Sequence, residues 1–461
     1  MADFIFSTDT FDEAADVVAS MLEERRFVAL REMLIPLTPQ DLSTLAGLLS
    51  EKQMPLFYRL LPKELAAEVF VEMDTEDQEA LIKAFSDYEL KAIFDELYLD
   101  DAVDIIEEMP ATVVKRILRQ SDAQTREWVN NILQYPKDSV GSIMTIEYVD
   151  LKGHLTVAEA IARIRSVGVD KETIYTCYVT DTNRKLLGYV TAKDILLADA
   201  AARIEDIMDT NVLYISTVAD KEEAVHMINR YDFLALPVVD GENRLVGIVT
   251  VDDAMDVMED EATEDIQKMA AMLPSEKPYI KSSVWSIWKQ RMPWLLMLMI
   301  SATFTGAIIT SFESALQSIP MLTAFIPMLM DTGGNAGSQA SVTIIRSLAL
   351  GDVTPRDIPR ILWKEMRVSV LCGVVLAMAN FLKILLIDNM LLQHTVSLLA
   401  AGVISVTLIA TVFTAKLVGC SLPILAKRIG FDPAVMASPF ITTVVDAISL
   451  TIYFLVASAV L

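Results

Sequence analysis

The residues best suited to ion chemistry lie in the apolar last third of the sequence. Asp446 stands within PFITTVVDAISLTIYF, a segment otherwise apolar enough to cross a membrane. A charge at the bilayer centre costs roughly 3 kcal/mol on insertion scales, so an acid there is by default a functional hypothesis. Thr442 and Thr443 lie within one helical turn of it, and Ser449 lies three residues after it. This spacing predicts a polar stripe that faces a pore; the alternative is an interhelical hydrogen bond.

A second polar stretch, PMLMDTGGNAGSQ, interrupts the apolar segment around residues 327–339. Glycine weakens a helix interior and polar side chains are costly in hydrocarbon, so this stretch must line a cavity or a helix contact. Gly333 and Gly337 have the spacing of a close helix contact. Gly333, Gly334 and Asn335 could instead offer carbonyl and amide groups to an ion. The residues alone leave packing and pore lining open.

Acidic residues recur in clusters before the apolar region. In LDDAVDIIEEM, Asp100 and Asp104 lie one turn apart on one helix face, where like charges repel unless a cation or base neutralises them. The segment MDVMEDEATEDIQKMAAM repeats this pattern just before the membrane. A solvated acidic face is the simpler interpretation of each cluster. Several clusters that repel unless an ion binds between them are nevertheless suited to sensing a cation.

The charge of the chain is divided between its two parts. From Ser286 onward there are 8 acidic and 11 basic residues, a net charge of +3. Since the whole chain carries −25, the 285 residues before Ser286 carry −28. An acidic half disfavours nucleic acid as a partner and favours cations. The three cysteines have no disulfide or metal spacing, and the N-terminus has no signal-peptide pattern. The acidic half is therefore expected in the cytoplasm.

The elements that hold these residues follow from periodicity. Residues 1–135 have apolar residues at helical spacing, and short helix starts recur in LTPQDL, LLPKEL, FSDYEL and EMPATV. This pattern predicts an all-α superhelix of stacked helices. Residues 136–260 contain two copies of one α/β unit, each reading strand, helix, strand, turn, strand, helix. Each copy ends in Thr-x-x-Asp at a helix start, Thr191 to Asp194 and Thr250 to Asp253.

The paired α/β units resemble a tandem CBS domain, a regulatory module that often binds adenine nucleotides. In nucleotide-binding members the aspartate of Thr-x-x-Asp binds ribose. The resemblance therefore implies a cleft for ATP formed by Asp194, with Lys193 and Phe233 nearby. The alternative is that Asp194 only caps its helix.

The remaining segments are a connecting helix, residues 261–285, and a membrane domain, residues 286–461. Five apolar runs are long enough to cross a bilayer, at about residues 292–312, 322–348, 368–387, 396–418 and 435–461. Basic residues alternate between the connections, with Lys416, Lys427 and Arg428 flanking the fourth. The positive-inside rule places the N-terminus in the cytoplasm and the C-terminus outside.

Together these features resemble the MgtE family of magnesium channels and transporters. The resemblance covers the whole chain, from the acidic helical domain through the tandem CBS domain and connecting helix to the five-span bundle. The family's membrane signature corresponds to the stretch from Pro327 to Gln339, and its pore aspartate to Asp446. Asp331 departs from the signature as an extra acid. The resemblance implies a magnesium transporter of the inner membrane, not an enzyme.

The resemblance also implies how transport is controlled. It implies a homodimer with one central pore and a plug helix at its inner face. Cytosolic Mg²⁺ between the acidic domains would stabilise the closed state. The positions that match the family's regulatory ligands are Glu68, Asp100, Asp104, Asp220, Glu222, Asp232, Asp253, Asp256, Glu261, Glu264, Asp265 and Asp432.

Magnesium sheds its water reluctantly, so a pore for it should use outer-shell contacts. Paired Asp446 carboxylates would attract the hydrated ion, with Thr442 beside them, and groups from Gly333 to Asn335 would bind its waters. Two other classes fit less well. A CBS-regulated anion channel needs basic intramembrane sites, and a membrane protease needs a zinc motif that the histidines do not form. A cation sensor without transport, and the choice between channel and carrier, stay open.

Overall fold

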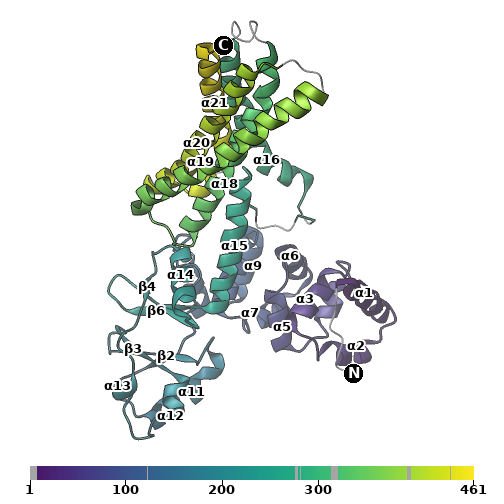
Figure 1. Cartoon of the computed structure of the whole chain (residues 1–461). Helices are drawn as coiled ribbons and strands as arrows, with labels where there is room; N and C mark the ends of the chain where they lie inside the picture. Colours follow the sequence, from purple (N-terminus) through teal and green to yellow (C-terminus); the bar gives the residue numbers. More distant parts are fainter. Residues whose placement is uncertain are drawn as a thin grey trace. The chain divides into compact units, whose positions relative to one another are not determined.

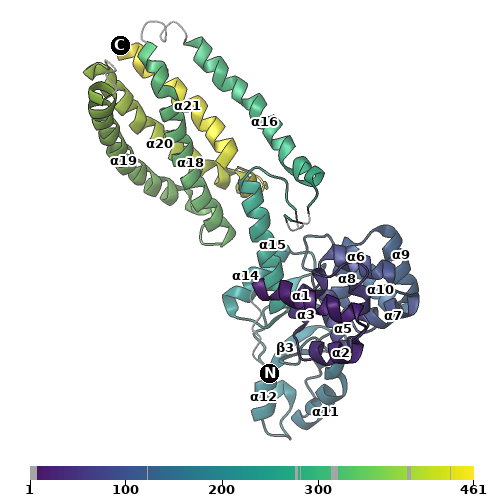
Figure 2. The ribbon, with the colours of Figure 1, turned by 90° about the vertical axis from the view of Figure 1, so that its right-hand side faces the viewer.

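The computed structural model describes residues 8–121, 123–275, 279–280, 282–312, 320–391, 396–436 and 438–460. The chain divides into two compact units, Met1–Met258 and Glu259–Leu461. Figures 1 and 2 show the elements of each unit, coloured along the sequence.

The first unit begins with a stack of short helices. Their bounds are α1 Thr8–Glu23, α2 Phe27–Leu34, α3 Pro39–Gly47, α4 Met54–Tyr58, α5 Lys63–Val71, α6 Thr75–Ala84, α7 Asp87–Phe94, α8 Leu99–Glu108, α9 Ala111–Gln120 and α10 Ala123–Ile132. The helices α3, α5, α7 and α9 begin within the four sequences that predict helix starts. Thr38 caps α3 by accepting from the Asp41 amide, and Ser86 forms a capping box with Glu89 at α7. Local capping chemistry therefore sets the helix boundaries.

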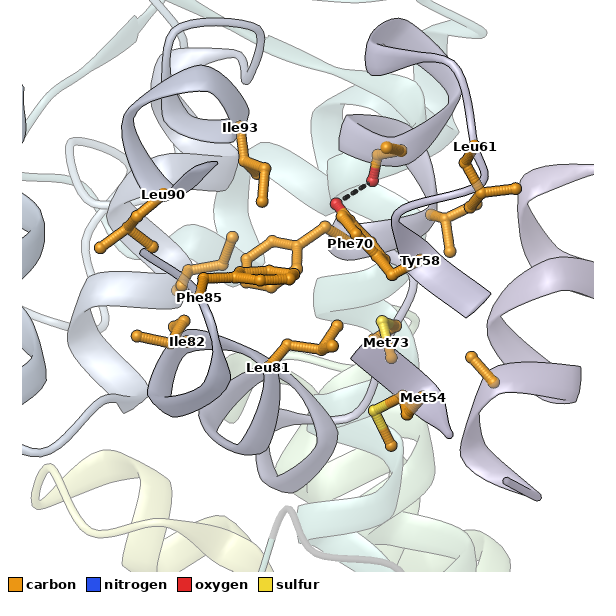
Figure 3. Packing of buried hydrophobic residues seen from close by; sticks show 14 of the residues in the cluster. Met54, Tyr58, Leu61, Phe70, Met73, Leu81, Ile82, Phe85, Leu90 and Ile93 are labelled. Carbon is orange, nitrogen blue, oxygen red and sulfur yellow. Dashed lines mark hydrogen bonds between the residues drawn. The ribbon is translucent and has the colours of Figure 1, made fainter. Parts of the chain in front are cut away.

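One apolar core joins these helices. Tyr58, Phe70 and Phe85 are buried at its centre, with the rings of Tyr58 and Phe85 5.2 Å apart (Figure 3). The Tyr58 hydroxyl donates to the Ala66 carbonyl, so the one polar group of this aromatic cluster is satisfied. Each short helix can thus bury its apolar face only against its neighbours, as in other stacked-helix repeats.

Two small sheets follow, as the internal repeat predicts. Strands β1 Asp150–Leu151, β2 Thr176–Thr180 and β3 Leu186–Thr191 form one sheet in the order β1-β2-β3. Strands β4 Ile215–Ser216, β5 Ala235–Val239 and β6 Leu245–Thr250 repeat it. In each sheet the first pair is parallel and the second antiparallel. The helices of this region are α11 Val157–Val167, α12 Ala192–Leu197, α13 Ile204–Ile207 and α14 Lys221–Tyr231.

The second unit contains the apolar helices. They are α16 Val284–Ser311, α18 Ile326–Ala349, α19 Ile358–Lys383, α20 Leu398–Arg428 and α21 Ser438–Val460. Four helical segments of the described residues are long and apolar enough to cross a membrane, beginning at Val284, Pro355, Leu398 and Pro433. The remaining predicted span, α18, has 24 residues and a length of about 36 Å. Its polar stretch explains its lower hydropathy.

The polar stretch of α18 lies within one continuous helix. The helix continues without a break from Ile326 to Ala349, so the glycines do not interrupt the span. Gly333, Gly334 and Gly337 are buried. A Cβ atom added at Gly334 would lie 2.6 Å from Thr442 Cγ2, and one at Gly333 would lie 2.9 Å from Thr411 Cγ2. The glycines thus let α18 pack closely against α20 and α21.

A charged pair lies among the apolar helices. Lys416 was expected to flank the connection after the fourth span, but α20 continues to Arg428 and holds Lys416 well inside it. The Lys416 ammonium lies 3.6 Å from a Glu365 carboxylate oxygen of α19, and both side chains are largely buried. A buried charge without a partner is strongly destabilising, so the pair explains how both residues are tolerated here. Neither residue provides a counter-charge for Asp446 in the described ion pairs.

Candidate ion pathway, carboxylate clusters and nucleotide cleft

Asp446 lies near the middle of α21 and is half-buried. Its Oδ1 atom is buried and has no hydrogen-bond partner among the described residues. The fully buried hydroxyls of Thr411 and Ser449 likewise lack partners in the described part of the chain. Gly333 brings them together, because a Cβ atom there would lie 3.1 Å from Ser449 Oγ and 2.9 Å from Thr411 Cγ2. Unsatisfied polar atoms therefore gather where α18, α20 and α21 meet.

One face of α18 is polar and exposed in the single chain. Asp331, Asn335 and Gln339 are exposed and follow one another at intervals of four residues. Such spacing places them on one side of the helix. Gly333 and Gly337 lie on the opposite side, and Gly334 lies beside the exposed face, one turn after Asp331. The structure therefore separates two roles that the sequence left together: Gly333 and Gly334 pack against neighbouring helices, and Asn335 is free to contact an ion.

The binding of the waters of an ion by groups from Gly333 to Asn335 stays a prediction. Gly333, Gly334 and Asn335 lie within a continuous α-helix, where backbone carbonyls accept hydrogen bonds from the following turn. Each of these carbonyls keeps a second lone pair that can accept from a water of the ion, and the Asn335 side chain adds its amide. Thr442 lies against Gly334, and its hydroxyl donates to the Pro439 carbonyl at 2.9 Å.

A carboxylate cluster forms in the first unit around Asp101, Glu172 and Asp253. Burial and the charges of Asp253 and Asp252 raise the pKa of Asp101 to about 6. Burial and the same two residues raise the pKa of Glu172 to about 7. The pKa of Asp253 is also raised, chiefly by burial. These acids repel one another, and Glu172 Oε2 is buried without a hydrogen-bond partner among the described residues.

The structure brings only some predicted ligands into this cluster. Asp253 and Asp256, both in the helix α15 Val251–Met269, interact with Asp101. The side chains of Asp100 and Asp104 lie outside the described residues. Glu68 on α5 is exposed, and Asp220 and Glu222 lie at the start of α14, where Asp220 caps the helix. Asp232 ends α14 in a left-handed conformation.

Sequence reasoning missed Glu172 and did not select Asp101 as a ligand. Asp101 stands in the same acidic run as Asp100, so its helix position was visible. Glu172 lies in a segment between a helix and β2, so no helical spacing to another acid marks it in the sequence. Only the fold brings it to Asp253.

A second acidic cluster lies at the end of α15, within the second unit. The Lys268 ammonium contacts Glu264 and lies 2.7 Å from an Asp432 carboxylate oxygen. Burial and the neighbouring Asp432 charge raise the pKa of Asp265. Glu261 also acts on Asp265, so the predicted ligands Glu261, Glu264, Asp265 and Asp432 do lie together. Sequence reasoning missed Lys268, which supplies a positive charge within the cluster.

No preformed chelate exists in these clusters. In the described part of the chain, no three Asp, Glu, His or Cys side chains are close enough to hold a metal ion. The donor set nevertheless suits Mg²⁺, which prefers carboxylate oxygens and usually keeps several of its waters. The buried, unpartnered Oε2 of Glu172 is the kind of atom that a hydrated cation would satisfy.

The carboxylate cluster of the first unit predicts that the stability of this unit depends on pH. Both Asp101 and Glu172 have raised pKa values, so they stabilise the folded unit at low pH, and this contribution is lost as pH rises through about 6 to 7. Without divalent cations, the fragment of residues 1–258 should therefore unfold at a higher temperature at about pH 5.5 than at about pH 8. The double variant Asp101→Asn with Glu172→Gln should show a smaller pH difference. If the unfolding temperature changed equally with pH in the wild type and the variant, Asp101 and Glu172 would not cause the pH dependence.

A cleft of about 490 Å³ opens between the two α/β units. Its lining includes Tyr175, Lys193, Asp232 and Phe233. Tyr175 is 65% exposed and so has its ring available for a ligand. Asp194, expected to bind ribose, is not among the lining residues; its carboxylate accepts from the Thr191 amide and hydroxyl in a capping box. Lys193 and Phe233 thus lie at the cleft, whereas Asp194 serves as a helix cap.

Comparison with known proteins matches three regions of the chain to family models. Residues 326–456 match a model described as a divalent cation transporter, MgtE. Residues 37–138 match the MgtE intracellular N domain, and residues 140–201 and 204–260 match CBS domains.

Similar proteins extend over nearly the whole chain. A magnesium transporter MgtE of Thermus thermophilus is 38% identical over 444 residues, which are 95% of this chain and 97% of the relative. A magnesium transporter MgtE of Bacillus subtilis is 30% identical and covers 98% of each chain.

Two solved structures resemble the cytoplasmic part. The cytosolic domain of the Mg²⁺ channel MgtE in complex with ATP has 38% identity and a TM-score of 0.51, and covers 53% of this chain and 99% of its own. The soluble part of a magnesium transporter has 28% identity and a TM-score of 0.51, and covers 55% of this chain and 99% of its own.

Proposed function

The chain belongs to the MgtE family of magnesium transporters, and we propose that it carries Mg²⁺ into the cytoplasm along a path beside Asp446 and closes when cytoplasmic Mg²⁺ is high. It is a multi-pass membrane protein and not an enzyme. The proposal adds the path, the direction and the control to this family assignment.

The observation that carries the proposed path is the position of Asp446. It lies near the middle of a membrane helix, its Oδ1 atom is unpartnered, and no described basic side chain lies within ion-pair distance of it. An acid at this depth is retained where it faces water or a passing ion. Asn335 and Gln339 form an exposed polar face on the neighbouring helix α18, which packs against α21 through Gly334. These groups together supply a polar path through an apolar bundle.

We expect two copies of the chain to enclose this path. In a single copy the polar face with Asn335 and Gln339 is exposed, and polar side chains exposed at membrane depth are costly against lipid. A second copy related by two-fold symmetry would present the same face and enclose the polar groups between the two chains. One Asp446 from each subunit would then flank the path. The N-terminus is expected on the cytoplasmic side of the inner membrane and the C-terminus on the outer side.

The oxygen donors favour Mg²⁺ with its waters over a bare ion. Carboxylate and amide oxygens suit a hard cation, and Mg²⁺ releases water reluctantly. The Asn335 and Asp446 side chains would contact the hydration shell, together with the carbonyls around Gly333. Ca²⁺, which is larger and more easily dehydrated, should fit such outer-shell contacts less well.

Closure is expected to use the two acidic clusters. Asp101, Glu172 and Asp253 repel one another in the absence of a cation, and so do Asp265 and Asp432 despite Lys268 nearby. The helix α15 contributes acids to both clusters, Asp253 to the first and Asp265 to the second. Carboxylates that hold cytoplasmic Mg²⁺ in the closed state would shift the population toward that state.

The cleft of the tandem α/β units is proposed to bind ATP. A solved relative is described in complex with ATP. Here the cleft offers aromatic faces at Tyr175 and Phe233 for a base, and the Lys193 ammonium for phosphate. Lys193→Ala should weaken ATP binding about tenfold by calorimetry, a loss of roughly 1.4 kcal/mol. The matched variant Lys185→Ala, outside the cleft lining, should bind as wild type; equal affinities for all three proteins would argue against phosphate at Lys193.

Growth tests the proposed direction of transport. Expression in a bacterium without its own magnesium uptake systems should restore growth in medium of low magnesium content. Failure to grow, with the protein present in the inner membrane at normal amounts, would contradict uptake.

A further inference from the structure

We propose that Asp331 is a second ion-binding carboxylate of the transport path and raises its affinity for divalent cations. This inference rests on the proposed path beside Asp446. The sequence marks Asp331 only as an extra acid, and the structure gives it a depth, a direction and a neighbour.

The depth of Asp331 follows from the helix contacts. The Tyr453 hydroxyl donates to the Leu322 carbonyl at 3.0 Å. Because Tyr453 stands seven residues before the end of α21 at Val460, the chain before α18 already lies about two turns inward from that end. Gly333 then lies against Ser449, which is near the midpoint of α21. Asp331 precedes Gly333 by only two residues, or about 3 Å of helix rise. Its carboxylate therefore lies far from the outer end of the bundle. From this depth it cannot reach the water at the membrane surface.

Asp331 is exposed at this depth and has no counter-charge. No described basic side chain lies within ion-pair distance of it, and no described donor bonds it; Lys383 of α19 pairs with Asp388 instead. An ionised carboxylate against lipid is costly, so it must face water or another chain. Asn335 and Gln339 continue the same exposed face, which the proposed path occupies.

Asp331 also interacts with Asp446. Gly334 lies against Thr442, Asp331 precedes Gly334 by one helical turn, and Asp446 follows Thr442 by one turn on α21. The two carboxylates therefore lie beside the same helix contact, where their charges repel. The second observation that points to a cation is the Oδ1 atom of Asp446, which is buried and has no hydrogen-bond partner among the described residues. Two neighbouring acids without a base are stable together when a cation neutralises them. At equal distance, a divalent cation gains twice the Coulomb energy of a monovalent one from each acid.

The affinity of transport tests this role. In proteoliposomes, Asp331→Asn should raise the Mg²⁺ concentration for half-maximal influx about tenfold and make influx more sensitive to Na⁺. Asp331→Glu should restore the wild-type value, because it keeps the charge. Asp352→Asn, the same change in an exposed loop residue after α18, is the matched control and should have no effect. An unchanged half-saturating concentration in Asp331→Asn would overturn the proposal.

A second measurement does not depend on transport by the variant. Asp331→Cys should react with a charged, membrane-impermeant thiol reagent, and Mg²⁺ should slow the reaction. The wild-type chain gives the baseline, since two of its cysteines are buried and the third is partly so. Absence of reaction beyond this baseline would place Asp331 away from water and overturn the proposal. Absence of Mg²⁺ influx through the wild-type chain would instead contradict the proposed function. The two failures can therefore be told apart.

Discussion

Asp446→Ala is expected to abolish Mg²⁺ influx in protein that is folded and inserted. Asp446 supplies the acid at the centre of the proposed path, and its Oδ1 atom has no partner that could replace an ion. Loss of one such charge should lower influx in proteoliposomes by at least about a hundredfold, or roughly 2.7 kcal/mol in the barrier. Asp446→Asn, which keeps the shape, should lose nearly as much because the missing property is charge.

Two controls separate this effect from misfolding. Asp352→Ala removes an acid from an exposed loop position and should transport as wild type. Gel filtration should show the same elution for wild type and all variants. Influx by Asp446→Ala above a tenth of the wild-type rate would mean that the ions pass elsewhere.

Neutralising the acids of α15 should remove closure by internal Mg²⁺. The quadruple variant changes Asp253, Glu261, Glu264 and Asp265 to their amides. These residues belong to the two clusters in which carboxylates repel, so their loss removes the differential binding that favours the closed state. The internal Mg²⁺ concentration that halves influx should rise at least about tenfold, while influx without internal Mg²⁺ should match wild type.

A matched variant controls for the loss of four charges. It carries the corresponding amides at four exposed acids of α1 and α2, namely Asp12, Glu13, Asp16 and Glu32. This variant should retain inhibition by internal Mg²⁺. If both quadruple variants were inhibited as wild type, the acidic clusters would not be the sensor.

The sequence predicts those features that depend on local chemistry. Thr38 and Ser86 stand at the starts of α3 and α7 because their side chains cap nearby amides, and a cap is visible in the sequence. The two α/β units are visible as a repeat, with Thr191 and Thr250 beginning equivalent helices. Asp446 is visible because an acid stands out among apolar residues.

Features that depend on packing between distant segments could not be predicted in this way. Gly333 and Gly334 have one sequence pattern for packing and for pore lining, and only the contacts with Thr411 and Thr442 assign them to packing. Glu172 joins Asp253 from a segment without a periodic pattern. Lys268 looks like an ordinary i, i+4 partner of Glu264, yet it also reaches Asp432. Each of these depends on which surfaces the fold brings together.

Ion flux through the purified wild-type chain tests the central claim most directly. The protein would be placed in liposomes that contain a magnesium-sensitive dye and almost no internal Mg²⁺, and Mg²⁺ or Ca²⁺ would be added outside. We expect rapid Mg²⁺ entry, slow Ca²⁺ entry, and arrest of Mg²⁺ entry when the liposomes are loaded with Mg²⁺ beforehand. Mg²⁺ entry no faster than in liposomes without protein would contradict the account.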